Sequence, residues 1–176
     1  MKTIVESGIS FGLFEDDKVF HIEKSDLYRR MNKGSVSGVK SAEFVCSIEK
    51  NRIFLVEAKP SSPHIDNNEK LYPWIDDIAN KFIHSLSLYS AVCLGMHGDK
   101  KNEIPKGLLK MHNSFITLNC ILVIKGHKEE WCLKIQDLLR DRMKLHRKIW
   151  NFEVIAINEH RVVKLHLGVP INYIGG

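Results

Sequence analysis

Strand-like runs of residues predict two β-hairpins in the first third of the chain. The first hairpin joins residues 9–14 to residues 18–23, and the acidic residues 15–17 interrupt these runs as a turn would. The second hairpin joins residues 42–48 to residues 52–59. Together they predict four strands before the first long helix.

Apolar residues at spacings of three and four predict two long helices. One covers residues 74–94 and ends at Gly95, and the other covers residues 129–150. A short helix over residues 26–31 is also expected, because Ser25 can cap its first turn.

Further strands are predicted at residues 115–124, 152–157 and 162–167, the last as a strand or an extension. This order of elements predicts an α/β (α+β) fold, in which helices flank a central mixed β-sheet. The chain contains no linker and no internal repeat, so we expect a single domain over residues 1–176.

The register of the second hairpin decides whether Glu43 and Glu57 share a face of the sheet. A three-residue loop at 49–51 pairs positions whose numbers sum to 100 and places the two glutamates opposite each other, whereas a two-residue loop separates them. The longer loop keeps the apolar positions together, and Asn51 tolerates the left-handed conformation that it requires. We therefore expect two carboxylates about 5 Å apart, with Lys59 beside them.

Two adjacent carboxylates repel each other unless a cation neutralises them. A ligand set of two or three carboxylates suits Mg²⁺ or Mn²⁺, and such an ion can activate water and stabilise charge on a phosphate oxygen. Lys59 could then position the water that attacks. The residues alone leave an alternative open, namely a surface ion pair between Glu57 and Lys59 on an edge strand.

The sequence resembles the PD-(D/E)XK nuclease superfamily in four features. These are the acid at 43, the tripeptide Glu57-Ala58-Lys59 on the next strand, the long helix that follows and the strand after it. The resemblance spans roughly residues 17–125. It implies a restriction-endonuclease-like core in which Glu43 and Glu57 hold a divalent metal, Ala58 offers its backbone carbonyl, and Lys59 serves the attacking water. The chain departs from the family pattern in having Ala-Glu where Pro-Asp is usual, and no helix is evident before the sheet.

Glu23 is a candidate for a third acid in this site. If residues 18–23 pair antiparallel with residues 42–48, Glu23 lies at the same sheet edge as Glu43 and Glu57. A solvent-facing glutamate is the alternative. Asp26 is a weaker candidate, because an acid in the first turn of a helix also favours the helix dipole.

Lys81 is a candidate for the same site from the long helix. Nucleases of this type sometimes contribute a polar residue from the helix that follows their Glu-x-Lys tripeptide. An ion pair between Asp77 and Lys81 is the alternative.

The charge of the chain adds a candidate binding surface. Lys and Arg number 26 against 21 Asp and Glu, which gives a net charge of +5, and ten basic and six acidic residues lie within 121–176. On the second long helix, Arg140, Lys144 and Arg147 recur at spacings of four and three, and Lys148 lies next to them. This basic face could bind nucleic-acid phosphates. A solvated helix face is the alternative.

The sequence thus predicts a nuclease that depends on Mg²⁺ or Mn²⁺ and hydrolyses phosphodiester bonds of nucleic acid, DNA rather than RNA. The chain has little room for a separate recognition domain, and small nucleases of the fold it resembles often dimerise, so a homodimer or a partner subunit is a further expectation. A catalytically inactive module of the same fold, binding nucleic acid or a protein, is the alternative, and an RNA-directed nuclease is a third possibility.

Several classes of protein are not indicated. No apolar run approaches the length of a membrane helix and no secretory signal is visible, so we expect a cytoplasmic protein without membrane contact. No P-loop occurs, and no serine with a paired histidine is evident. Cys46, Cys93, Cys120 and Cys132 are expected to be reduced core thiols, since their spacing suits no zinc site.

Overall fold

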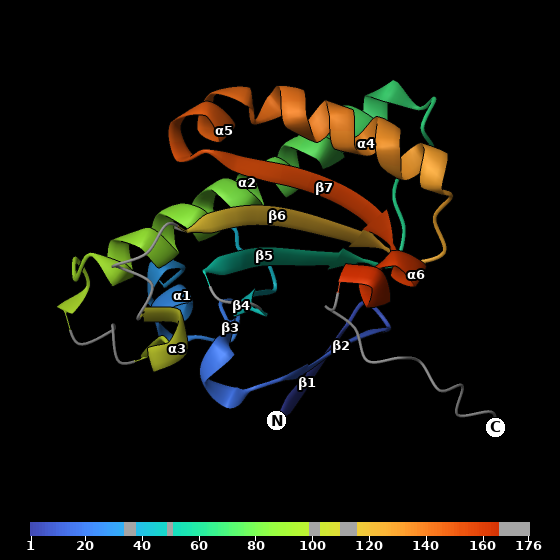
Figure 1. The fold of residues 1–176 in the computed structure, drawn as a ribbon. Coiled ribbons are helices and arrows are strands. Elements are labelled where there is room, and N and C mark those ends of the chain that lie inside the picture. The colour runs from blue at the N-terminus through green and yellow to red at the C-terminus, as the bar shows by residue number, and fades with distance from the viewer. Residues whose placement is uncertain (34–37, 49–50, 99–102, 110–115, 166–176) are drawn as a thin grey trace.

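The computed structural model describes residues 1–33, 38–48, 51–98, 103–109 and 116–165. Two sheets are present in these ranges, one of two strands and one of five in the order β3-β4-β5-β6-β7 (Figure 1). The strands are β1 (Lys2–Glu6), β2 (Ile9–Phe14), β3 (Val19–His21), β4 (Phe44–Ser47), β5 (Arg52–Lys59), β6 (Thr117–Ile124) and β7 (Phe152–Asn158).

The helices differ widely in length. They are η1 (Asp16–Lys18), α1 (Asp26–Met31), α2 (Asn68–Cys93), α3 (Lys106–Leu109), α4 (Glu129–Arg142), α5 (Lys144–Trp150), α6 (Glu159–Val162) and η4 (Val163–Leu165), of which η1 and η4 are 3₁₀ helices. No helix within the described ranges is long and apolar enough to cross a membrane.

The large sheet is mixed, as the sequence predicts. Strand β4 runs antiparallel to both of its neighbours, β3 and β5, and β6 and β7 continue parallel to β5. The carboxyl ends of β5, β6 and β7 therefore meet at one edge, where their arrowheads point in Figure 1. The start of β4 lies at the same edge, because β4 is antiparallel to β5.

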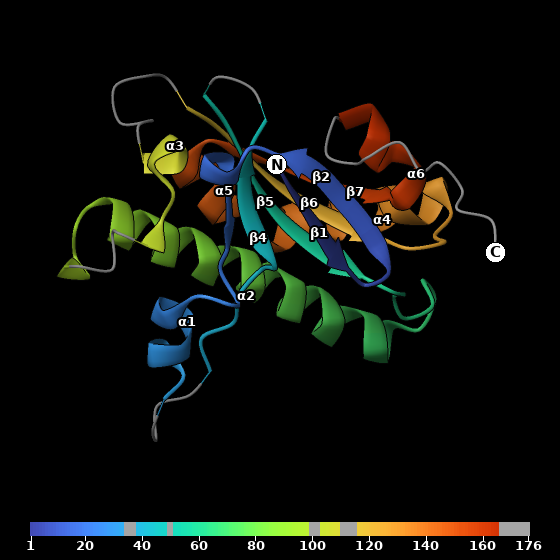
Figure 2. The same cartoon turned by 90° about the horizontal axis from the view of Figure 1, so that it is seen from below.

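Both faces of the large sheet are covered. Apolar residues of α2 and α4 pack on one face, with Leu55 and Leu122 among the sheet residues beneath them. The β1–β2 hairpin and α6 cover the other face, where Phe44 and Val56 lie (Figure 2). Side chains on both faces of β5 are consequently buried.

The predicted register of the β4–β5 hairpin is confirmed. Phe44 pairs with Val56 and Cys46 with Phe54, so the paired numbers sum to 100. Asn51 has a φ of 68°, the left-handed conformation expected for it. Residues 49 and 50 of the predicted loop lie outside the described ranges.

The predicted hairpin between residues 9–14 and 18–23 is wrong. Strand β2 pairs instead with β1, through a tight turn at Ser7 and Gly8 that both have positive φ. The acidic turn folds as η1 and sends β3 to the large sheet, where it pairs antiparallel with β4. The β1–β2 hairpin does not extend the edge of the large sheet. Its aromatic residues pack on the face of that sheet, where the Phe11 ring is centred 5.3 Å from the ring of Phe44.

Three other element boundaries also differ from the predictions. Helix α2 begins at Asn68, six residues before the predicted start, and it includes Pro73 in its first turns. The helix predicted over 129–150 is interrupted at Met143, a buried residue with φ −100° and ψ 11°. The strand predicted at 162–167 is helical over Val162–Leu165, and its last two residues lie outside the described ranges.

The prediction of reduced thiols is confirmed. All four cysteines lie in described ranges without a disulfide, three of them buried and Cys93 half-buried. Burial raises the pKa of the Cys132 thiol to about 11, and nearby Glu129 and Glu159 add to this shift.

We expect Asn51→Ala to lower the free energy of unfolding by about 1 kcal/mol, because alanine is strained in the left-handed conformation of Asn51. Asn51→Gly should cost less, because glycine adopts positive φ without a steric penalty. Urea denaturation of both variants measures the difference. An equal loss in the two variants would contradict this explanation of the hairpin.

Candidate active site

Glu57 and Lys59 lie near the carboxyl end of β5, on the face that α2 covers. Glu57 is fully buried, and its Oε1 lies 2.8 Å from the Nζ of Lys59 and 2.8 Å from the Nζ of Lys81 on α2. The ion pair between Glu57 and Lys59 therefore exists, but it lies on the central strand of the sheet and not on an exposed edge strand. One buried carboxylate thus holds two ammonium groups.

Lys81 belongs to this cluster and not to an ion pair with Asp77. The Asp77 carboxylate binds the ammonium of Lys40 instead. Burial lowers the pKa of Lys81, but the charge of Glu57 and its hydrogen bond to the ammonium outweigh burial, so the pKa lies above its ordinary value. Lys81 is accordingly a permanent cation beside Glu57.

Glu43 lies just before β4 and faces the same cluster. Its backbone N–H donates to the carbonyl of Val56 at 3.0 Å, which fixes it across from Glu57. Burial raises the pKa of the Glu43 carboxyl to about 8, with further contributions from the charge of Glu57 and from a hydrogen bond with Glu23. Glu43 therefore carries a proton at neutral pH.

The structure brings Glu23 to the site and leaves Asp26 outside it. Glu23 follows β3, and the carboxyl groups of Glu23 and Glu43 are hydrogen-bonded. Asp26 pairs on the surface with Arg29 at 2.6 Å. Three glutamates and two lysines thus gather where β3 ends, β4 begins and β5 ends.

A divalent metal can be tested against these residues. The second oxygen of Glu57, Oε2, is buried and has no hydrogen-bond donor among the described residues. The protonated Glu43 indicates a place where negative charge lacks compensation. Mg²⁺ commonly uses one or two carboxylates and keeps several waters, so Glu43 and Glu57 suit it. A group of three or more His, Cys, Asp or Glu side chains arranged to hold a metal is not found within the described ranges.

The predicted carbonyl ligand has a partner within the protein. The Ser7 hydroxyl, in the turn between β1 and β2, donates to the Ala58 carbonyl at 3.0 Å. The Ala58 side chain packs on the opposite face of the sheet from Glu57. Metal ligation by this carbonyl stays a prediction.

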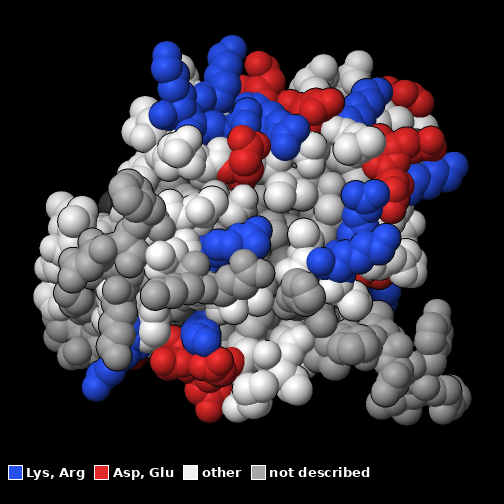
Figure 3. Space-filling view, viewed as in Figure 1, with Lys and Arg blue, Asp and Glu red and all other residues white. Residues whose placement is uncertain are grey.

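The predicted basic face does not form one cationic stripe. The guanidinium groups of Arg147 and Arg140 both bind the carboxylate of Glu153. The distances are 2.9 and 3.0 Å for Arg147 and 3.4 Å for Arg140. Lys144, at the start of α5, lies 3.5 Å from Asp141. Figure 3 shows acidic side chains among the basic ones over α4 and α5. For Lys148, no ion pair with a described residue is found.

A contact between Ser62 and His127 was not expected from the sequence. The Ser62 hydroxyl lies 3.0 Å from His127 Nε2, and it also donates to the carbonyl of Pro63 at 2.9 Å. The described residues give His127 Nδ1 no hydrogen bond to a carboxylate that would complete a catalytic triad. Sixty-five positions separate the two residues, and no local signal relates them.

Comparison with protein-family models, with curated proteins and with solved structures finds no match to this chain.

We expect the stability of the metal-free protein to depend on pH through Glu43. Its carboxyl has a pKa of about 8 in the folded protein and an ordinary value of 4.5. Between these pH values the folded state binds more protons than the unfolded state, so the free energy of unfolding falls as pH rises. Urea denaturation in EDTA should show this fall for the natural chain and a smaller one for Glu43→Gln. An identical decline in both would contradict the assignment.

The two lysines should act together on Glu57. We expect Lys59→Met or Lys81→Met alone to cost about 1–3 kcal/mol, because a charged contact with the buried Glu57 carboxylate is lost. The double variant should cost more than the sum, since it leaves the buried carboxylate without a cation. Adding Glu57→Gln to the double variant should restore part of the loss, as measured by chemical denaturation. Strict additivity would indicate that the lysines do not share Glu57.

Proposed function

We propose that this chain is a divalent-metal-dependent nuclease with a restriction-endonuclease-like core, which hydrolyses phosphodiester bonds of nucleic acid, DNA rather than RNA. The observation that carries the proposal is the buried Glu57 with Lys59 and Lys81 on one oxygen and Glu43 across from it, just before the neighbouring strand. The order of elements supports it, because three antiparallel strands are followed by a long helix and a parallel strand.

In this proposal Glu43 and Glu57 hold Mg²⁺ or Mn²⁺, and Glu23 assists. A bound ion of this kind would activate water and stabilise charge on the phosphate. Glu43 must lose its proton before it can bind the ion, so metal binding releases a proton and strengthens as pH approaches 8. Lys81 places its ammonium 2.8 Å from Glu57 Oε1 from the helix side.

Lys59 is the residue proposed to position the water. Its side chain is 22% exposed, whereas the Glu57 side chain that it contacts is fully buried. It can therefore donate to a water at the mouth of the site while it remains beside Glu57. A cation in this position also stabilises the negative charge that develops on the phosphate.

Substrate binding would fall to the basic residues of α4 and α5. Arg140, Lys144 and Arg147 would need to exchange their acidic partners for phosphates, whereas Lys148 is exposed and faces no such competition from a described acid. Cleavage of both strands of a duplex would call for a second copy of the chain or a partner subunit, by analogy with small nucleases of this type.

A second candidate function is a non-catalytic module that binds nucleic acid or a protein. Two contacts favour it, namely the donation from Ser7 to the Ala58 carbonyl and the neutralisation of Glu57 by two lysines. In that case the cluster stabilises the sheet and no metal enters.

Cleavage of single- and double-stranded DNA and RNA in Mg²⁺ or Mn²⁺ tests the proposal. We expect DNA cleavage that EDTA abolishes and that Lys59→Ala reduces at least about 100-fold, because an electrostatic contact in the transition state is lost. Glu57→Gln should have the same effect.

Lys33→Ala is the matched control, because Lys33 is exposed at the end of α1 and should leave activity unchanged. Circular dichroism would check that each variant folds. Cleavage that persists in Lys59→Ala would contradict the proposed site, cleavage of RNA alone would overturn the substrate, and binding without cleavage would favour the non-catalytic module.

A further inference from the structure

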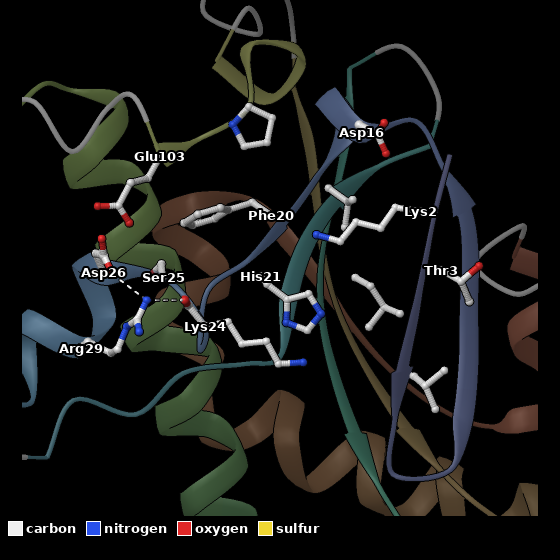
Figure 4. A pocket seen from close by; sticks show the side chains of 14 residues that line it. Lys2, Thr3, Asp16, Phe20, His21, Lys24, Ser25, Asp26, Arg29 and Glu103 are labelled. Atoms are coloured by element: carbon white, nitrogen blue, oxygen red, sulfur yellow. Dashed lines mark hydrogen bonds and ion pairs between the residues drawn. The ribbon is translucent and has the colours of Figure 1, made fainter.

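The chain segment 40–43 leads into β4 beside β5, and within the described ranges no strand pairs with it on its other side. Its last residue, Glu43, donates its backbone N–H to β5. Strand β3, the other neighbour of β4, pairs only as far as His21 opposite Phe44. Figure 4 shows the chain after His21 passing Ser25 toward α1, beside a cavity of about 620 Å³. Because buried N–H groups require acceptors, the backbone before Glu43 needs a partner other than a strand.

Helix α2 supplies that partner through two consecutive side chains. The backbone N–H of Lys40 donates to Nδ1 of His84 at 3.0 Å. The backbone N–H of Ala42 donates to Oγ of Ser85 at 2.7 Å. A backbone N–H can only donate, so Nδ1 of His84 is the unprotonated ring nitrogen. The segment 40–43 is consequently bound by β5 on one side and by α2 on the other.

The contact between Ser85 and Ala42 lies in the protein interior. Ser85 is 1% exposed and Ala42 is fully buried. Among the described residues no other acceptor is found for this N–H, and a buried N–H without an acceptor is rare in folded proteins. The ion pair between Lys40 and Asp77 also fastens the segment to α2, but both side chains are partly exposed and it is expected to contribute less. Ser85 is therefore the main support of the segment from the helix.

Lys81, His84 and Ser85 lie on one face of α2, because they are spaced by three and four residues along the helix. The ammonium of Lys81 lies 2.8 Å from Oε1 of Glu57. The same face of the helix thus contacts Glu57 directly and holds the backbone that precedes Glu43. The position of these two glutamates relative to each other depends on a single helix as well as on the pairing of β4 with β5.

We propose that Ser85 and His84 are positioning residues for Glu43, which hold the preceding backbone so that the Glu43 carboxyl faces Glu57 across the site. The inference rests on the proposed function, because the divalent ion of that function is what Glu43 and Glu57 would hold. Neither Ser85 nor His84 would contact the ion or the substrate, and each acts through the backbone of residues 40–42. Hydrogen bonds behind metal ligands fix the orientation of the ligands, and their loss lowers metal affinity.

Binding of Mn²⁺ to the full chain, measured through the EPR signal of the free ion, tests this positioning. The natural chain should bind Mn²⁺, and Glu43→Gln should abolish the binding. Ser85→Ala should weaken it about tenfold, because the N–H of Ala42 loses its acceptor and the backbone before Glu43 can shift. The measurement needs neither a substrate nor cleavage.

His84 offers two variants that differ in a single acceptor. His84→Leu should weaken Mn²⁺ binding, because the N–H of Lys40 loses its acceptor. His84→Asn should restore most of the affinity, since the side-chain oxygen of asparagine can accept from the same N–H. A loss of equal size in both variants would contradict the role of this hydrogen bond.

Ser87→Ala is the matched control for the loss of a hydroxyl from α2. The Ser87 hydroxyl is exposed and donates to the carbonyl of Ile83 in the same helix, so its removal should leave the Mn²⁺ affinity unchanged. Asn51→Ala is the control for stability, because it is expected to destabilise the hairpin at the end of β5 that is remote from Glu57. It should also keep the natural affinity.

The possible results separate the inference from the proposed function. Unchanged Mn²⁺ affinity in Ser85→Ala, or an equal loss of affinity in Asn51→Ala, would overturn the inference and leave the proposed function standing. Mn²⁺ binding that depends on Ser85 in a chain that cleaves no nucleic acid would remove the nuclease function and keep the inference. A natural chain that binds no Mn²⁺ would overturn both.

Discussion

The buried carboxylate of Glu57 is the constraint on which the site and its surroundings depend. A carboxylate with no exposure on a central strand stays ionised only if cations and donors replace its hydration. Lys59 meets this need from the same strand, because alternate residues share a face, and Lys81 meets it from α2. The position of α2 across β5 is therefore set by charge as well as by apolar packing. Glu43 and Glu23 then add negative groups that two lysines do not balance, and Glu43 keeps its proton.

The parts of the site that the sequence could predict are those carried by local rules. The period of two along a strand places Glu57 and Lys59 on one face, and the apolar pattern selects the register that brings Glu43 opposite. Asn51 added a conformational reason for the same loop. The α/β fold with a mixed sheet followed from the alternation of strands and helices. Metal binding, catalysis and the nucleic-acid substrate stay predictions.

Features that depend on long-range contacts could not be predicted in the same way. Residues 9–14 look like a partner for residues 18–23, but their aromatic side chains gain more by packing on the sheet face beside Phe44. The ion pair expected between Lys81 and Asp77 does not form. Lys40, which lies outside α2, binds the Asp77 carboxylate, and Lys81 binds Glu57 instead. Helical periodicity continues through residue 143, yet the helix is interrupted at the buried Met143, and both α4 and α5 pack on β7.

The hydrogen bond from Ser7 to the Ala58 carbonyl links the two sheets in addition to their apolar packing. Ala58 lies between Glu57 and Lys59 in the strand. The hydrogen bond from Ser7 therefore holds the backbone between the two charged residues, from the opposite face of the sheet. The β1–β2 hairpin contributes no side chain to the acid cluster, but it limits how far this stretch of β5 can shift. The first fourteen residues therefore act as part of the site's mechanical support, and loosening them would change the alignment of the cluster without altering any charged residue in it.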